Sequence, residues 1–196
     1  MLIAAAKSSC LGEIAIIVSA LSIQDPRDTP ADKRQAAREK HAAFDHPDSD
    51  FLSLVNLWSD FEISRQELTH SQLRKYCNRN FLSYARMREW RETHRQLLSL
   101  CHQLRLTTNK SAGKYRDIHT ALLVGSLNQV GSRSEGADYL GSRNRKFRLL
   151  PVSSLATKPP KWIVSGTLFE TTQAYSSAAA KIEPEWIEGV AGHLVR

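Results

Sequence analysis

The residues of this sequence best suited to chemistry are cations and aromatics gathered in one short segment, from Tyr139 to Arg148. Its two aromatic residues are Tyr139 and Phe147, and its four cations are Arg143, Arg145, Lys146 and Arg148. Cations neutralise phosphates and release counterions, while exposed aromatic or guanidinium planes stack on unpaired bases. The segment, which also holds Asn144, therefore favours contact with a nucleic-acid strand. The alternative is a solvated hairpin edge whose charges only prevent aggregation.

Two further groups of cations lie elsewhere in the chain. Lys158 and Lys161 flank a proline pair just before Trp162 and add to the positive surface of the same region. Arg88, Arg91 and Arg95 share one face of a predicted helix, since they stand at i, i+3 and i+7. Acidic residues flank these arginines, and a helix of mixed charge is more often an ordinary solvated surface than a ligand track.

The positive charge of the protein is concentrated in one region. The formal net charge is +7 and the isoelectric point is near 9.5. Residues 105–161 hold eleven Lys and Arg against three Asp and Glu, whereas residues 1–104 are nearly balanced. A polyanionic partner is therefore expected to meet residues 105–161 first.

Motifs for independent catalysis are missing from the sequence. Ala112-Gly113-Lys114-Tyr115 lacks the earlier glycine and the hydroxyl of a phosphate-binding loop, so a surface turn is expected there. No nucleophile elbow, zinc helix or calcium loop is present. We therefore expect no catalytic residue, no metal site and no bound cofactor in this chain.

Cysteine and hydropathy patterns point to a compartment. The cysteines are odd in number and widely spaced, with no metal-ligand spacing, which fits a reduced cytoplasm; they are Cys10, Cys77 and Cys101. The apolar run of residues 14–21 is too short to span a membrane, so no membrane partner is expected.

Helical periodicity dominates the first 106 residues. Residues 2–23 form a predicted helical segment interrupted near Ser8-Ser9, and Asp28-Thr29-Pro30 offers a cap for a charged helix that runs to Phe44. A turn at residues 46–50 caps the next helix, and apolar spacing between residues 69 and 106 predicts two more, with His94 as a packing residue. An all-helical bundle is expected.

The remaining residues read as a small barrel. Glycines and prolines punctuate short apolar runs from Lys110 onward. Residues 118–130 are predicted as one more helix, residues 147–152, 162–169 and 174–181 as strands, and residues 185–195 as a closing helix. The expected fold class is α+β and multidomain: an all-α bundle followed by a small β-barrel with flanking helices.

The beginning of the sequence suggests that its helical region is incomplete. No turn or cap precedes Met1-Leu2-Ile3-Ala4, so the chain begins almost inside an element. On this interpretation Ile14 and Ile17 would lack packing partners, and the N-terminal end would be the least stable part of the fold.

Several motifs taken together resemble the region that follows the motor domains of DEAH-box RNA helicases, especially of the bacterial HrpA type. In the helical part they are Ala20 to Arg27, His46 to Phe51, Leu54 to Trp58, and Arg86 to Trp90. In the barrel part they are Tyr139 to Asn144, Lys158 to Trp162, Glu170-Thr171, and Ile182 to Trp186. Their order and spacing carry the resemblance, which covers nearly the whole chain. Ser49-Asp50-Phe51 departs from the Gly-Asp-His of many eukaryotic members, which favours the bacterial branch.

This resemblance implies a domain division and a partner. Residues 1–107 would be the later part of the helicase-associated (ratchet) bundle, and residues 108–196 an OB-fold with its C-terminal helix. In such enzymes both modules line a tunnel for single-stranded RNA, while separate motor domains bind ATP and Mg²⁺ and hydrolyse the nucleotide. By carry-over, the RNA contacts would be Arg86, Arg88 and Arg91 of the bundle helix and Arg143, Arg145, Lys146 and Lys161 of the barrel. The remaining candidate RNA contacts are Asn144, Arg148, Lys158 and Arg95. The chain alone lacks every nucleotide-handling motif of the family and is expected not to hydrolyse ATP.

Two other functions are compatible with the same residues. The barrel could be a protein-interaction or scaffold module, since a fold does not dictate its ligand. The chain could also be an inactive truncated gene product. Salt dependence separates RNA binding from protein interaction, because phosphate contacts weaken steeply with ionic strength.

Overall fold

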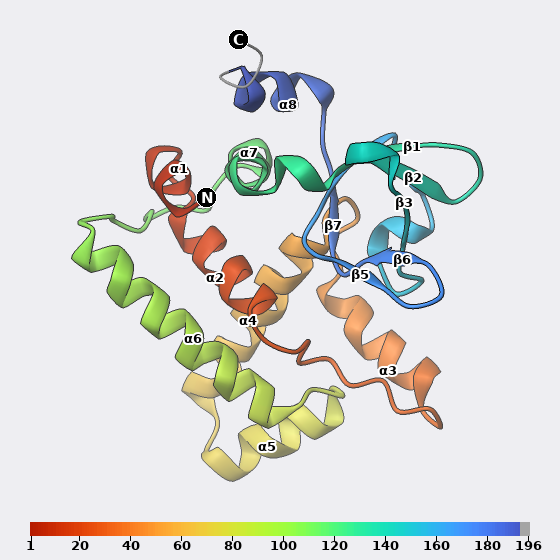
Figure 1. Ribbon diagram of the computed structural model, residues 1–196. Coiled ribbons are helices and arrows are strands. Elements are labelled where there is room, and N and C mark those ends of the chain that lie inside the picture. The colour runs from red at the N-terminus through yellow and green to blue at the C-terminus, as the bar shows by residue number, and fades with distance from the viewer. Residues whose placement is uncertain (193–196) are drawn as a thin grey trace.

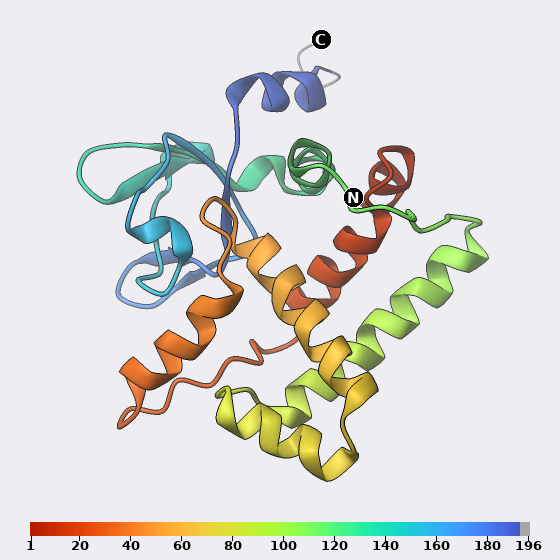
Figure 2. The ribbon, with the colours of Figure 1, turned by 180° about the vertical axis from the view of Figure 1, so that it is seen from behind.

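The structure, a computed structural model, describes residues 1–192 and places most helices on one side of the molecule and the strands on the other, with α3 below the strands (Figures 1 and 2). The helices are α1 (Leu2–Lys7), α2 (Leu11–Leu21), α3 (Arg34–His41), α4 (Asp50–Glu67), α5 (His70–Arg79), α6 (Tyr84–Gln103), α7 (Tyr115–Ser126) and α8 (Pro184–Ala191). The short 3-10 helices are η1 (Ala42–Phe44), η2 (Leu127–Gln129), η3 (Ser142–Asn144) and η4 (Ser154–Ala156). The strands are β1 (Val130–Arg133), β2 (Asp138–Gly141), β3 (Lys146–Leu149), β4 (Trp162–Ser165), β5 (Leu168–Glu170), β6 (Ala174–Ser176) and β7 (Ala179–Lys181).

Side-chain caps fix the starts of the bundle helices. Ser49 accepts a hydrogen bond from the backbone of Leu52 at the start of α4, as the predicted turn at residues 46–50 requires. Thr69 and Gln72 form a reciprocal capping box on α5, and Ser83 caps α6. Such caps satisfy backbone N–H groups that a helix cannot pair internally.

The core cluster shared by α2, α4, α5 and α6 contains two tryptophans that contact each other. Trp58 of α4 and Trp90 of α6 meet at 5.0 Å between ring centroids, and the indole N–H of Trp90 donates to the Ile16 carbonyl at 3.1 Å. His94 packs on Trp58 at 4.5 Å, and burial lowers the pKa of its imidazole. The prediction that His94 is a packing residue is confirmed.

The expectation that α2 lacks partners is wrong. Ile14 and Ile17 are fully buried, because α2 is covered by α4, α6 and α7. Their core also contains Phe51, Leu122 and Val164, so it joins the helices to the sheet. Sequence periodicity identified the apolar face but not the later elements that cover it.

The seven strands form one curled sheet, a half-barrel consistent with an OB-fold. Their order is β5-β6-β3-β2-β1-β4-β7, and neighbours are antiparallel except for β3 and β6. The predicted fold class, a helical part followed by a small barrel with a flanking helix, is confirmed.

Several predicted boundaries within the sheet are wrong. Residues 130–141 form the hairpin of β1 and β2, whereas the prediction placed Val130 at the end of a helix and no strand before residue 147. The segments 162–169 and 174–181 each divide into two short strands. The first divides where the chain bends at Gly166, whose N–H donates to the carbonyl of Ala178, in the break between β6 and β7. A Cβ on Gly166 would lie 3.2 Å from Phe51, so the bend brings the sheet against α4.

Three helix ends also differ from prediction. The helix expected behind Pro30 begins at Arg34, because Asp28 instead pairs with Arg86 and its N–H donates to Phe81. Helix α7 begins at Tyr115, three residues early. Helix α8 ends at Ala191, and the part of its predicted range beyond residue 192 lies outside the described residues.

A polar joint attaches the start of α4 to the barrel. The Asp50 carboxylate, which is 8% exposed, accepts hydrogen bonds from Ser153 Oγ, the Ser154 N–H and hydroxyl, and the Ala179 N–H, at 2.7 to 3.0 Å. Beside it Ser49 forms an isolated bridge with Ala180 of β7. The predicted domain boundary at residues 107 and 108 falls between α6 and α7 and stays a prediction. Among residues 1–192, no helix is both long and apolar enough to cross a membrane.

Candidate nucleic-acid interface

The basic segment at residues 143–148 is divided between two faces of the sheet. Side chains alternate along β3, so Phe147 points into the barrel and is 2% exposed, whereas Lys146 and Arg148 point outward. Arg145, just before the strand, reaches across the mouth of the barrel to Glu170. Cations that are contiguous in sequence therefore serve two different surfaces.

The two aromatic residues of the segment are core residues, which corrects their predicted role as stacking platforms. Tyr139 is 1% exposed and stacks on Phe147 at 5.8 Å. Its hydroxyl donates to the Pro160 carbonyl at 2.8 Å, which holds the loop that carries Lys158 and Lys161. Neither ring is free to meet a base.

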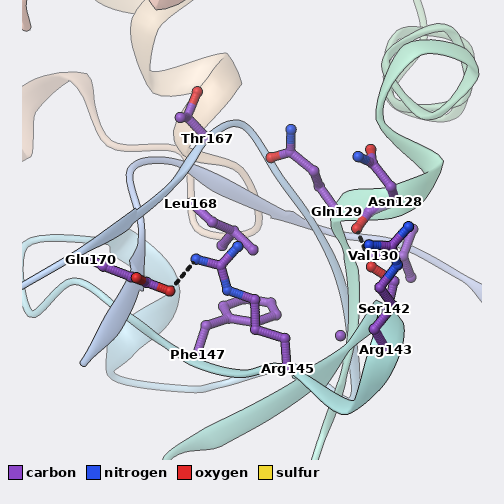
Figure 3. A pocket seen from close by; sticks show the side chains of 11 residues that line it. Asn128, Gln129, Val130, Ser142, Arg143, Arg145, Phe147, Thr167, Leu168 and Glu170 are labelled. Carbon is purple, nitrogen blue, oxygen red and sulfur yellow. Dashed lines mark hydrogen bonds and ion pairs between the residues drawn. The ribbon is translucent and has the colours of Figure 1, made fainter.

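A pocket of about 660 Å³ opens at the mouth of the barrel (Figure 3). Apolar side chains of Val130, Phe147 and Leu168 form part of its lining. Gly141 and seven polar residues complete the lining: Asn128, Gln129, Ser142, Arg143, Arg145, Thr167 and Glu170. The combination of an apolar surface, amides and guanidinium groups is suited to a polar ligand with a flat apolar part and a negative charge.

The cations of this pocket stand in different electrostatic environments. Arg145 pairs with Glu170 at 2.6 Å, and both side chains are largely exposed, at 45% and 69%. Exposed ion pairs contribute little free energy, so a phosphate can compete for Arg145. Arg143 and Asn144 both have left-handed backbones, with φ of 56° and 57°. They form a tight turn, and Arg143 of this turn lines the pocket.

The other barrel cations lie toward the opposite end of the strands. Arg148 is paired with Asp138 across β2 and β3. Lys158 and Lys161 are exposed on a loop held by Arg133, which donates to the carbonyls of Lys161 and Pro159. The structure therefore brings Arg143 and Arg145 together but separates them from Lys158 and Lys161.

The arginines of the bundle are mostly compensated by carboxylates. Arg86 pairs with Asp28 at 2.9 Å, Arg91 with Glu62 at 2.7 Å, and Arg95 with Glu92 at 2.7 Å. Arg88 is exposed beside Glu89 in a groove between α4 and α6. Their assignment as RNA contacts stays a prediction.

Sequence reasoning missed three residues of this surface. Arg133 was counted in the basic region but not singled out, although it orders the loop of Lys158. Phe169 and Tyr175 stack on each other at 6.1 Å, and Phe169 is 37% exposed. Their strands were predicted, but only the pairing of β5 with β6 brings the two rings together.

The glycine turn before α7 does not fit a nucleotide phosphate. The Gly113 N–H already donates to the Glu13 carboxylate at 2.7 Å, and a Cβ on Gly113 would lie 2.7 Å from Cys10. The glycine is therefore explained by close packing. Burial raises the pKa of the Cys10 and Cys77 thiols to about 11, so both stay protonated at neutral pH. In the described part of the chain, no group of three or more potential ligands is placed to hold a metal.

Comparisons with known proteins agree with this architecture. The oligonucleotide/oligosaccharide-binding (OB)-fold family matches residues 118–194, and the helicase associated domain (HA2), described as ratchet-like, matches residues 1–54. The fold and its surface thus define a class of protein: ratchet-like, helicase-associated helices joined to an OB-fold.

Two relatives of the chain are named as HrpA helicases. The chain is 42% identical, over its whole length, to the ATP-dependent RNA helicase HrpA of Escherichia coli (strain K12) and to its homolog in Haemophilus influenzae (strain ATCC 51907 / DSM 11121 / KW20 / Rd). It spans 15% of the length of each. The chain therefore matches the helicase-associated and OB-fold region of HrpA-type helicases, which confirms the resemblance drawn from its motifs.

Proposed function

We propose that this chain is an accessory RNA-binding region of a helicase and that it holds single-stranded RNA at the mouth of its barrel. Separate motor domains, on a longer protein or another chain, would bind ATP and Mg²⁺ and would be its protein partners, in a cytoplasmic setting. The relatives are named as ATP-dependent RNA helicases, which supports this reading.

One observation carries the placement of RNA on the barrel. Among residues 1–192, no ion pair involves Arg143, Lys146, Lys158 or Lys161, and all four side chains are exposed. Of the candidate arginines in the bundle, only Arg88 is both exposed and outside any ion pair among the described residues. A cation without a carboxylate partner has no ion pair to give up when it meets a phosphate, so the barrel offers the larger electrostatic gain.

Salt dependence tests this placement. If about three to five phosphates are contacted, the log-log slope of affinity against salt should be roughly 2 to 3.5 in magnitude for a single strand. Replacing Arg143, Arg145 and Lys146 together by Ala should flatten the slope by about two. The matched triple replacement of Arg88, Arg91 and Arg95 should change it by less than about one. Fluorescence anisotropy with an unstructured RNA measures all three slopes.

Circular dichroism establishes that each variant folds before its slope is interpreted. A larger loss of slope in the bundle variant would move the RNA to α6. Complete absence of salt dependence in the parent chain would instead favour the protein-interaction function, which the compensated charges of the bundle also permit.

Removing the acidic partner of Arg145 should strengthen RNA binding. Glu170→Gln deletes the one carboxylate in the pocket lining while keeping the side-chain size. Releasing Arg145 from an exposed ion pair should raise the affinity about two- to fivefold, while the slope should stay near that of the parent, because Arg145 is already counted among the cations that meet phosphate. The matched control is Glu185→Gln, an exposed carboxylate on α8, which should leave both quantities unchanged. Weaker binding by Glu170→Gln would show that the carboxylate itself contacts RNA.

A further inference from the structure

A stacked pair of aromatic rings lies on the outer face of the half-barrel. Phe169 of β5 and Tyr175 of β6 are direct partners in the antiparallel pairing, with ring centroids 6.1 Å apart and planes inclined by 29°. Their neighbours Leu168 and Ala174 pack into the barrel core, so the alternation of side chains directs Phe169 and Tyr175 away from it. Neither ring belongs to any of the core clusters.

The exposure of this pair has no structural reason in the described fold. Phe169 is 37% exposed and Tyr175 is half-buried. Strand β5 forms one edge of the sheet, and an exposed apolar edge strand promotes unwanted pairing unless it is protected. An aromatic pair in such a position therefore suggests a ligand that covers it.

Cations adjoin the aromatic pair on the same face. Arg148 of β3 is the register partner of Tyr175 in the parallel pairing, so both side chains share the outer face. Lys146 lies two residues before Arg148 and faces the same way. The Asp138 carboxylate holds Arg148 beside the strands without neutralising Lys146. Positive charge therefore stands next to two flat rings, which is the chemistry that recognises a base together with its phosphate.

We propose that the outer face of β3, β6 and β5 is a stacking site for an unpaired nucleobase. The base would cover the Phe169–Tyr175 pair, and the adjoining phosphate would meet Lys146 and Arg148. The proposal rests on the proposed RNA-binding function and extends it, because the mouth pocket lies on the other side of the same strands. A strand that leaves the pocket would pass around the edge strand β5 onto this face.

Base stacking can be separated from phosphate contact by the choice of probe. Full chain carrying Phe169→Thr and Tyr175→Thr, which retain β-propensity, is titrated with a 12-nucleotide oligo(A) and with an abasic strand of the same length. The double variant should bind oligo(A) roughly tenfold more weakly, since stacking of one base supplies about that factor or more. Its affinity for the abasic strand and its salt slope should equal those of the parent. Val152→Thr, at another exposed apolar residue of the barrel, is the matched control.

A crosslink locates the base directly. A strand that contains 5-iodouridine should crosslink on irradiation to the peptide carrying Phe169 or Tyr175 in the parent chain. Equal affinity of parent and double variant for oligo(A), or an equal loss on both probes, overturns the stacking site. Failure of the parent to bind any strand would instead overturn the proposed function.

Discussion

Replacing Asp50 by Ala should destabilise the folded chain by about 3 to 5 kcal/mol, because the substitution leaves several buried donors without an acceptor. The carboxylate accepts two backbone and two hydroxyl hydrogen bonds from the far side of the joint. The hydroxyls of Ser153 and Ser154 can turn to other partners. The N–H groups of Ser154 and Ala179 cannot, and each unsatisfied buried donor costs about 1 to 3 kcal/mol.

Urea unfolding followed by tryptophan fluorescence measures this effect. Domains of this size are stable by only about 5 to 15 kcal/mol, so the loss should shift the midpoint far below that of the parent. Asp50→Asn should cost less, about 2 kcal/mol, since one amide oxygen still accepts while the amide N–H faces the Ala179 donor. Asp32→Ala, at an exposed carboxylate, should change stability by less than about 0.5 kcal/mol.

The result bears on function because Asp50 joins the two parts that would hold RNA. A loss below about 1 kcal/mol for Asp50→Ala would mean that the joint adapts, and that the orientation of barrel and bundle is set by the shared apolar core instead. If the predicted loss is found, the position of the mouth pocket relative to α6 depends on one carboxylate.

Local signals in the sequence were sufficient for most of the helical part. Ser49, Thr69 and Ser83 are short polar residues of the kind that favour helix starts, and each caps a helix of the bundle. Asp28 follows the same rule but does not begin a helix, because its carboxylate is captured by Arg86, 58 residues later. A tertiary contact can override a local preference without leaving any trace in the local sequence.

The barrel was predicted less completely because its strands are short. Four-residue strands such as β1 and β2 carry too few alternations to distinguish them from a loop. The site was affected in the same way. The composition of residues 139–148 identified a basic region, but such short strands did not reveal the register that buries Tyr139 and Phe147 and pairs Phe169 with Tyr175, although each pairing joins strands that are adjacent in the chain.

The sequence also did not predict how the cations of residues 143–148 lie relative to one another. Residues 143–148 read as one basic cluster, yet period-two alternation divides it between the mouth and the outer face. The ion pair of Arg145 with Glu170 joins residues 25 positions apart. Net charge therefore identified the region that holds most of the unpaired candidate cations, but not which of its cations are paired with a carboxylate.

A buried histidine beside the Asp50 joint makes the stability of the fold depend on pH. His119 of α7 is fully buried, and its Nδ1 lies 2.6 Å from the Tyr115 carbonyl, so this nitrogen carries the proton and donates. The Nε2 atom therefore accepts from the Ser49 hydroxyl at 2.8 Å. Both ring nitrogens are satisfied in the neutral form.

Burial lowers the pKa of His119, the Tyr115 carbonyl acts in the opposite direction, and the nearby His46 also lowers it, so that the pKa is about 4. The unfolded chain has the ordinary histidine pKa of about 6.5. Below pH 6.5 the unfolded state therefore binds a proton that the folded state excludes, and stability falls with pH until the folded state also titrates near pH 4.

We expect this histidine to remove about 2.5 kcal/mol of stability between pH 7 and pH 4.5. His119→Gln keeps an acceptor for Ser49 but cannot titrate. Its stability should therefore fall by about 2.5 kcal/mol less than that of the parent between pH 7 and pH 4.5, although the variant should be less stable than the parent at pH 7. His102→Gln, at an exposed histidine on α6, should retain the parent's pH dependence. Urea midpoints at the two pH values give the comparison. If parent and His119→Gln lose the same stability between pH 7 and pH 4.5, the pH dependence belongs to other groups. The neutral Ser49–His119 contact would then have no measurable part in holding α4 to α7.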